Sequence, residues 1–157
     1  MCDNDLNTEI LWQRPGFLIR RLNQIHHAIF FENMNGKITP LQYGLLTVLN
    51  TQNGLDQTAL SEELGADRTT LATSIELLEK RDLLRREVHY SDKRRKVVSI
   101  TLKGKRLLVK TQQQMHEAQL RFLEPLSAPE RKQFLHLMKT LVEGNNHIAS
   151  VPIKHFE

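Results

Sequence analysis

The chain has 157 residues, of which 39% are hydrophobic and 25% charged, and its formal net charge is +4. These values fit one ordinary globular domain and exclude a disordered or fibrous protein. The apolar runs are short and the polar start lacks a secretory signal, so we expect no membrane partner and a cytoplasmic location. The single cysteine, Cys2, excludes an internal disulfide and a thiolate zinc site.

The positive charge is concentrated in residues 85–96. This window holds six basic and two acidic side chains, a local excess of +4 that equals the net charge of the whole chain. Such a concentration of charge attracts polyphosphate and releases its counterions, although a charge run can also be a solvated surface. The elements that flank the window decide between these interpretations.

The first predicted helix covers residues 11–34, where apolar residues recur on one side until the turn signal at residues 35–36. A second helix is expected to begin with a capping box, in which Thr39 and Gln42 satisfy each other's backbone and Pro40 takes the first helical position. It should end near Asn53-Gly54.

Two short helices follow, separated by Gly65-Ala66 and expected to be capped by Asp56 and Asp67. In the second of them Leu71, Ile75 and Leu78 lie at helical spacing, which turns one face inward and leaves the other free. This arrangement predicts a helix-turn-helix that reads DNA. The side chains expected on the free, DNA-binding face are Arg68, Thr69, Thr70, Thr73 and Ser74.

Within and after the basic window, a basic turn separates two runs with β-branched residues, 87–90 and 97–101, which predicts a β-hairpin. The tip of this hairpin would act as a wing, with Lys93, Arg94 and Arg95 on the DNA phosphates.

Two helices are predicted after the wing. The first begins near Gly104, and the second opens with a capping box at residues 127–130. Their apolar stripes and that of the first helix need a partner, and a two-fold homodimer would bury them. The predicted fold is mainly α with a small β-hairpin: a winged helix-turn-helix lobe at 37–101 and dimerisation helices at 1–36 and 102–157.

Specific residues carry a resemblance to a known family. Asp92-Lys93-Arg94, then Val98-Ser99-Ile100-Thr101 and Gly104, match the wing pattern of the MarR family of bacterial transcriptional regulators, and residues 64–70 and 78–81 are similar to its turn and recognition helix. The resemblance implies that Arg94 reaches into a minor groove, a task that suits a planar, weakly hydrated guanidinium. Thr73 stands where many members have a basic residue, and Asp82 replaces a frequent glycine.

The first helix resembles a subgroup that responds to aromatic carboxylates, on the evidence of residues 14–22 together with His26. This resemblance implies that Arg20 and His26 contact the ligand; Asn23 lies between them, and Arg68 would couple the ligand to DNA. An arginine suits a carboxylate and a neutral imidazole suits a phenolic hydroxyl. An ideal helix places Arg20 and His26 about 120° apart, so they would face one cleft from two walls. A solvated arginine and an ordinary interface histidine are the other interpretations.

We therefore expect a homodimeric repressor on double-stranded DNA with an inverted repeat, released by a small aromatic acid and controlling its own catabolic genes. Two alternatives stay open: a peroxide or redox sensor acting through Cys2, and a sequence-neutral architectural DNA-binding protein. The seven histidines lack ligand spacing, and no phosphate-loop or G-x-S-x-G motif is present. We expect no metal, no cofactor and no enzymatic activity.

Overall fold

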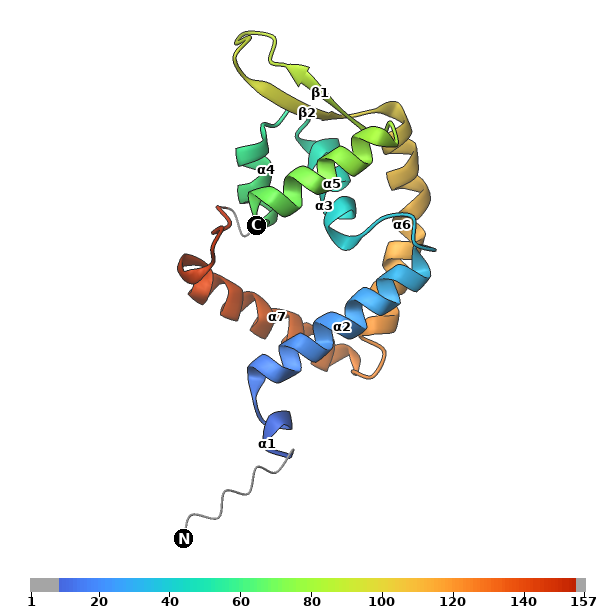
Figure 1. Cartoon of the computed structure of the whole chain (residues 1–157). Coiled ribbons are helices and arrows are strands. Elements are labelled where there is room, and N and C mark those ends of the chain that lie inside the picture. Colours follow the sequence, from blue (N-terminus) through green and yellow to red (C-terminus); the bar gives the residue numbers. More distant parts are fainter. Residues whose placement is uncertain (1–8, 155–157) are drawn as a thin grey trace.

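The computed structural model describes residues 9–154, and this part of the chain is mainly helical with one two-stranded antiparallel sheet (Figure 1). The predicted fold class is confirmed. Within these residues no helix is both long and apolar enough to cross a membrane. In chain order the elements are α1 (Glu9–Trp12), α2 (Pro15–Asn33), α3 (Pro40–Thr51), α4 (Gln57–Leu64), α5 (Arg68–Lys80), β1 (Leu84–Val88), β2 (Lys96–Ile100), α6 (Leu102–Phe122), α7 (Ala128–Asn145) and η1 (Asn146–Ile148).

The prediction of one helix over residues 11–34 is wrong, because the chain breaks between α1 and α2. Pro15 has no backbone N–H to donate, and its ring disfavours the helical conformation in the residue before it. Arg14 is accordingly extended, with φ −93° and ψ 117°, and Pro15 takes the first position of α2. Only the second part of the predicted helix is therefore one continuous rod.

The predicted caps are present. The Thr39 hydroxyl accepts a hydrogen bond from the Gln42 amide at 3.2 Å, and the Gln42 side chain accepts one from the Thr39 amide at 3.1 Å. Asp56 and Asp67 each accept a backbone N–H at 2.9 Å, at the starts of α4 and α5. Gly65 ends α4 in the left-handed region at φ 58°, which glycine adopts without strain.

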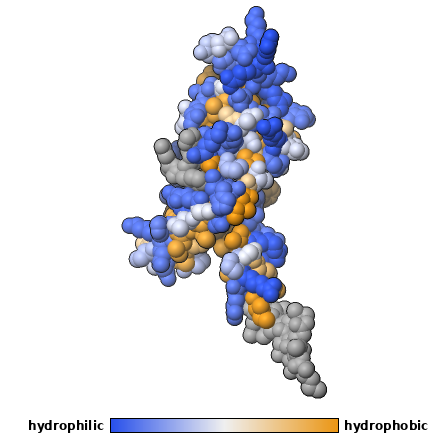
Figure 2. Space-filling view, turned by 90° about the vertical axis from the view of Figure 1, so that its left-hand side faces the viewer, coloured by the Kyte–Doolittle hydropathy of each residue, from blue (hydrophilic) through white to orange (hydrophobic). Residues whose placement is uncertain are grey.

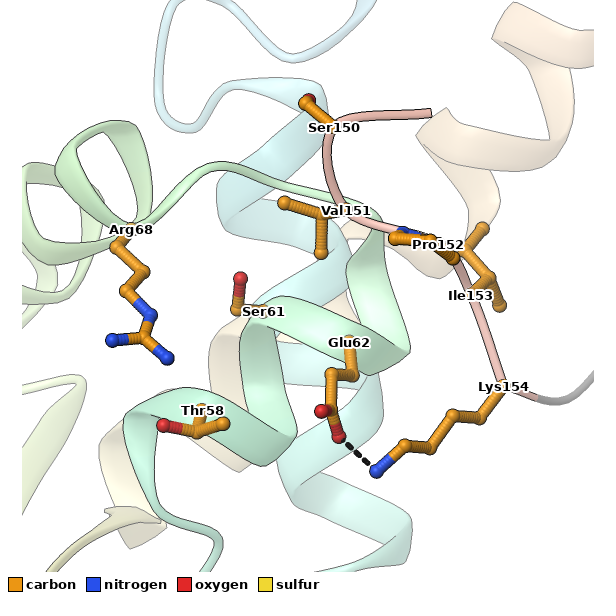
Figure 3. Close-up of a pocket in the computed structure, with 9 residues that line it drawn as sticks. All are labelled: Thr58, Ser61, Glu62, Arg68, Ser150, Val151, Pro152, Ile153 and Lys154. Carbon is orange, nitrogen blue, oxygen red and sulfur yellow. Dashed lines mark ion pairs between the residues drawn. The ribbon is translucent and has the colours of Figure 1, made fainter. Parts of the chain in front are cut away.

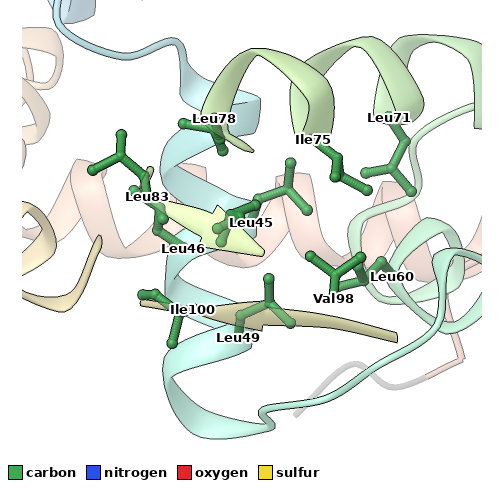
Figure 4. Close-up of a cluster of buried hydrophobic side chains, with 11 residues drawn as sticks. Leu45, Leu46, Leu49, Leu60, Leu71, Ile75, Leu78, Leu83, Val98 and Ile100 are labelled. Carbon is green, nitrogen blue, oxygen red and sulfur yellow. The ribbon is translucent and has the colours of Figure 1, made fainter. Parts of the chain in front are cut away.

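A single apolar cluster holds the helix-turn-helix and the hairpin together (Figure 4). Leu71, Ile75 and Leu78 are fully buried, so the predicted inward face of α5 is confirmed. Gly104 is required where α6 leaves this core, since a side chain there would collide with the Leu83 carbonyl oxygen. The residues that join the inward face of α5 in the cluster are Leu45, Leu46, Leu49, Leu60, Leu83, Leu84, Val98 and Ile100.

The terminal helices are far less buried than this lobe. A small cluster around Phe30 of α2 and Met34, which follows α2, packs against α6, but α7 has no buried residue. Figure 2 shows more hydrophobic surface in the lower half, where α1, α2 and α7 lie, than in the upper half. The large apolar side chains that α1, α2 and α7 expose include Trp12, Ile19, Ile25, Phe31, Leu135, Leu137, Leu141 and Val142.

Candidate functional site

The outer face of α5 is polar and open. Arg68, Thr69, Thr70 and Thr73 are exposed, as the sequence predicted. The expectation that Ser74 lies on the same face is wrong, because Ser74 is 9% exposed. It follows Leu71 by three residues and therefore lies on the buried side of the helix.

Local hydrogen bonds fix the start of α5. Besides its cap to the Thr70 amide, Asp67 accepts the Thr70 hydroxyl at 2.6 Å, and both bonds lower the pKa of this carboxyl. Gln57 of α4 donates its side-chain amide to the Arg68 carbonyl at 3.1 Å. Within residues 9–154 the Arg68 guanidinium has no hydrogen bond or ion pair, so its charge is available.

The hairpin projects beyond α5 and carries the basic turn at its tip (Figure 1). Its strands pair in an antiparallel register, from Leu84 with Ile100 to Val88 with Lys96. Lys93 and Arg94 are exposed and form no ion pair among the described residues. Two cations at the tip are therefore presented to solvent.

Arg95 is arranged differently from its neighbours. Its guanidinium lies 2.6 Å from the Asp56 carboxylate at the start of α4. The structure thus brings Arg95 to the helix-turn-helix rather than leaving it free beside Lys93 and Arg94.

Glu79 joins the hairpin to α5, a contact that sequence reasoning missed. One of its carboxylate oxygens accepts the Arg86 amide at 3.1 Å, and the other lies 3.0 Å from the Arg86 guanidinium. No local pattern indicates such a pair, because it depends on how β1 folds back along α5. The contact fixes the angle at which helix and wing are presented together.

Three of the four predicted ligand residues, Arg20, Asn23 and His26, lie on α2, and the fourth, Arg68, begins α5. Arg20 is exposed and its guanidinium lies 5.4 Å from the centre of the Phe17 ring, while Asn23 is exposed on α2. Arg68 lines a pocket that contains none of the other three residues.

His26 is half-buried and packs edge-on against the Phe122 ring of α6, with centroids 5.5 Å apart. Burial, and secondly the charge of His27, lower the pKa of His26 below its ordinary value. The neutral imidazole, which can both donate and accept a hydrogen bond, is therefore favoured at neutral pH.

The pocket beside Arg68 has a volume of about 420 Å³ and lies between the helix-turn-helix and the C-terminal segment (Figure 3). Asn146 holds this segment by accepting the Ile153 amide at 2.9 Å and donating to its carbonyl at 2.8 Å. Ile153 lies against Gly65, and Lys154 pairs with Glu62. The segment thus connects the end of α7 to the turn between α4 and α5.

Cys2 lies outside the described residues, and within them no cluster of His, Cys, Asp or Glu could hold a metal ion.

Comparisons with known proteins place this geometry in context. A family model described as MarR family matches residues 37–95. The chain is 31% identical to the transcriptional regulator HosA of Escherichia coli over 124 residues, which are 79% of this chain and 91% of HosA.

Two solved structures share the fold. The PcaV transcriptional regulator from Streptomyces coelicolor, in complex with its natural ligand, has a TM-score of 0.79 and 32% identity over 85% of this chain and 94% of PcaV. Bordetella bronchiseptica BpsR, whose structure concerns regulation of DNA binding by 6-hydroxynicotinic acid, has a TM-score of 0.77 and 26% identity over 82% of this chain and 92% of BpsR.

Proposed function

Since the chain belongs to the MarR family of transcriptional regulators, we propose that it is a homodimeric repressor of an inverted-repeat operator, released by a small aromatic carboxylic acid. It is a DNA-binding regulator and not an enzyme. What we propose is its assembly, its mode of reading DNA and its signal.

The observation that carries the DNA-reading part is the open polar face of α5 beside a cationic wing tip. Arg68, Thr69, Thr70 and Thr73 have the size and polarity to contact base edges in a major groove, while Lys93 and Arg94 neutralise phosphates or enter the minor groove. In a two-fold dimer the two α5 helices would read half-sites one helical turn, ~34 Å, apart.

The exposed apolar side chains of α1, α2 and α7 support the dimer. Trp12, Phe31 and Leu141 are each more than 60% exposed in the single chain, on helices that lie outside the DNA-binding lobe. A second copy related by a two-fold axis would cover these side chains, and apolar burial drives such association.

Arg20 and His26 support the aromatic-acid signal. The Arg20 guanidinium can bind a carboxylate with two parallel hydrogen bonds, and the neutral imidazole of His26 can pair with a ring hydroxyl. PcaV binds a natural ligand, and the DNA binding of BpsR is regulated by a hydroxylated aromatic acid. We propose that Asn23 completes this site and that the ligand favours a spacing of the lobes that no longer fits DNA, so that ligand and operator weaken each other.

The deciding experiment is fluorescence anisotropy of the purified protein on DNA from upstream of its own gene, with a shuffled duplex as control. Tight binding to the first duplex alone supports an operator reader, whereas equal binding to both indicates an architectural protein. The complex is then titrated with benzoates, hydroxybenzoates and hydroxycinnamates. Release by one of these acids supports the proposed signal. If none of them releases the DNA, the aromatic-acid signal is contradicted, while the proposal that the protein reads an operator stands.

A further inference from the structure

A second concentration of positive charge lies on α6 and plays no part in the function proposed above. Residues 102–114 contain four basic side chains and no acidic one. This local excess is as large as that of the wing window. The four residues are Lys103, Lys105, Arg106 and Lys110.

Three of these residues and Arg81, which follows α5, line a pocket of about 430 Å³. Lys103, Arg106 and Lys110 recur at helical spacing and share one side of α6, and Arg81 faces them from the end of α5. Leu83 and Leu107 are the remaining lining residues, so the pocket has no carboxylate in its wall. We call it the α6 pocket.

The cations of the α6 pocket are positioned without counterions. The Lys103 ammonium donates to the Arg81 carbonyl at 2.8 Å, and the Arg81 guanidinium donates to the Lys37 carbonyl at 2.6 Å. No ion pair within residues 9–154 joins any of the four to an acidic side chain. Like charges at this spacing on a helix repel each other, and a bound anion would relieve that repulsion.

The α6 pocket is electrostatically separate from the wing tip. The hairpin strands have five residues each, so their base lies roughly 17 Å from the turn at about 3.3 Å per residue. This exceeds the Debye length of about 8 Å at physiological ionic strength. Figure 1 shows that α6 starts at the base of the hairpin, at the opposite end from the basic turn. A polyanion bound at the wing tip would therefore not screen the cations of the α6 pocket.

We propose that the α6 pocket binds a small phosphate-bearing anion of two or more charges, such as a diphosphate group. Four cationic residues line the pocket, more than one carboxylate needs, and two of them are arginines, whose planar forks match phosphate oxygens. Leu83 and Leu107 supply apolar contact for an organic body, and the volume lies in the usual range for small ligands, about 300–1,000 Å³. Because Arg81 follows α5 and Leu83 precedes β1, the bound anion ties the recognition helix and the wing to α6.

The test is calorimetric titration of the full-length protein with inorganic pyrophosphate and with ADP, and with acetate as a monoanionic comparison that lacks the ring expected at the Arg20 and His26 site. The first variant carries Arg106→Gln and Lys110→Gln. The control carries Lys132→Gln and Lys139→Gln, which remove the same charge from exposed positions on α7. We expect pyrophosphate and ADP to bind the wild type more tightly than acetate does. Both should bind the first variant at least 10-fold more weakly than the wild type, and they should bind the control variant as tightly as the wild type.

Three results would overturn the proposal: no heat of binding in the wild type, equal loss in both variants, or acetate binding as tightly as pyrophosphate. DNA titrations at several salt concentrations test whether the α6 pocket contacts the DNA backbone instead of a small anion. If the Arg106/Lys110 variant binds all DNA sequences more weakly with a smaller salt slope, and pyrophosphate does not bind the wild type, the surface contacts the DNA backbone instead. Thermal unfolding of each variant confirms that it is folded, and operator binding by the wild type tests the repressor proposal separately.

Discussion

The Arg95 guanidinium lies 2.6 Å from one oxygen of Asp56, whose other oxygen accepts the Ala59 amide at 2.9 Å and so caps α4. The Ala59 hydrogen bond and then the Arg95 side chain lower the pKa of this carboxyl. One carboxylate therefore both caps α4 and pairs with Arg95, the residue that precedes β2. The wing is thus positioned by a residue that does not belong to the hairpin.

Asp56→Ala should lower the free energy of unfolding by about 1 kcal/mol, the usual cost of losing an N-cap. Urea denaturation followed by circular dichroism measures the change. Asp56→Asn is the matched control, because it keeps a capping oxygen and loses only the charge, so a smaller loss is expected. Equal stability of the alanine variant and the wild type would contradict the capping role.

The same carboxylate predicts a pH dependence of stability. Its pKa is lower in the folded chain than the ordinary value of 3.8, so its contribution is complete above that value and is lost as the pH falls through the folded pKa. Denaturation midpoints measured at successively lower pH should therefore fall less steeply for Asp56→Asn than for the wild type. Parallel curves for the two proteins would show that the charge is not stabilising.

Arg94→Ala should weaken binding to every DNA sequence and reduce the slope of log affinity against log salt by about 1, because one phosphate-neutralising cation is lost. Arg85→Ala is the control: Arg85 belongs to the same basic window but lies on β1, 2.6 Å from Glu87. It should bind DNA much as the wild type does. Anisotropy at several salt concentrations measures both variants, and equal slopes for all three proteins would place the wing tip away from DNA.

Arg20→Ala should still bind the operator but no longer release it on addition of the aromatic acid, because the carboxylate loses its bidentate partner. Its neighbour offers a matched control, since Arg21 is exposed and donates to Gln24 on the same helix. Arg21→Ala should respond to the acid normally. Normal release by the Arg20 variant would mean that the acid binds elsewhere.

His26 should make the protein less stable in mild acid. Its folded pKa lies below the ordinary 6.5, so the unfolded chain takes up the proton first, and stability declines as the pH falls below 6.5 until the folded pKa is passed. His26→Phe keeps the packing against Phe122 and should flatten the stability curve over this window. His116→Gln, an exposed substitution on α6, should not. Urea denaturation at a series of pH values gives the comparison.

Asn146→Ala should release the C-terminal segment from the helix-turn-helix, because both hydrogen bonds to Ile153 are lost. Hydrogen exchange at the Ile153 amide should accelerate, and the free energy of unfolding should fall by about 1–3 kcal/mol for two ordinary hydrogen bonds. Asn145→Ala removes only a bond to the Leu141 carbonyl of its own helix and should leave Ile153 protected. Unchanged exchange in the Asn146 variant would show that other contacts hold the segment.

The sequence by itself determined the features that depend on near neighbours. Caps at Thr39, Asp56 and Asp67 join residues three apart, and the buried stripe of α5 follows from helical periodicity. The same periodicity already placed Ser74 beside Leu71, and the break before Pro15 was also a local signal. The sequence therefore contained the signals for the burial of Ser74 and for the helix break at Pro15, although both predictions were wrong.

Only the tertiary structure decided the contacts between distant segments. Arg95 meets Asp56 across 39 positions, Arg81 meets Lys37 across 44, and Ile153 reaches Gly65 only after α7 has brought the chain back. No periodicity encodes such pairs, because their partners are set by where the core holds each helix and how the chain returns over it. For the same reason the basic residues of α6 read as an ordinary charged helix until Arg81 is seen to face them across a pocket.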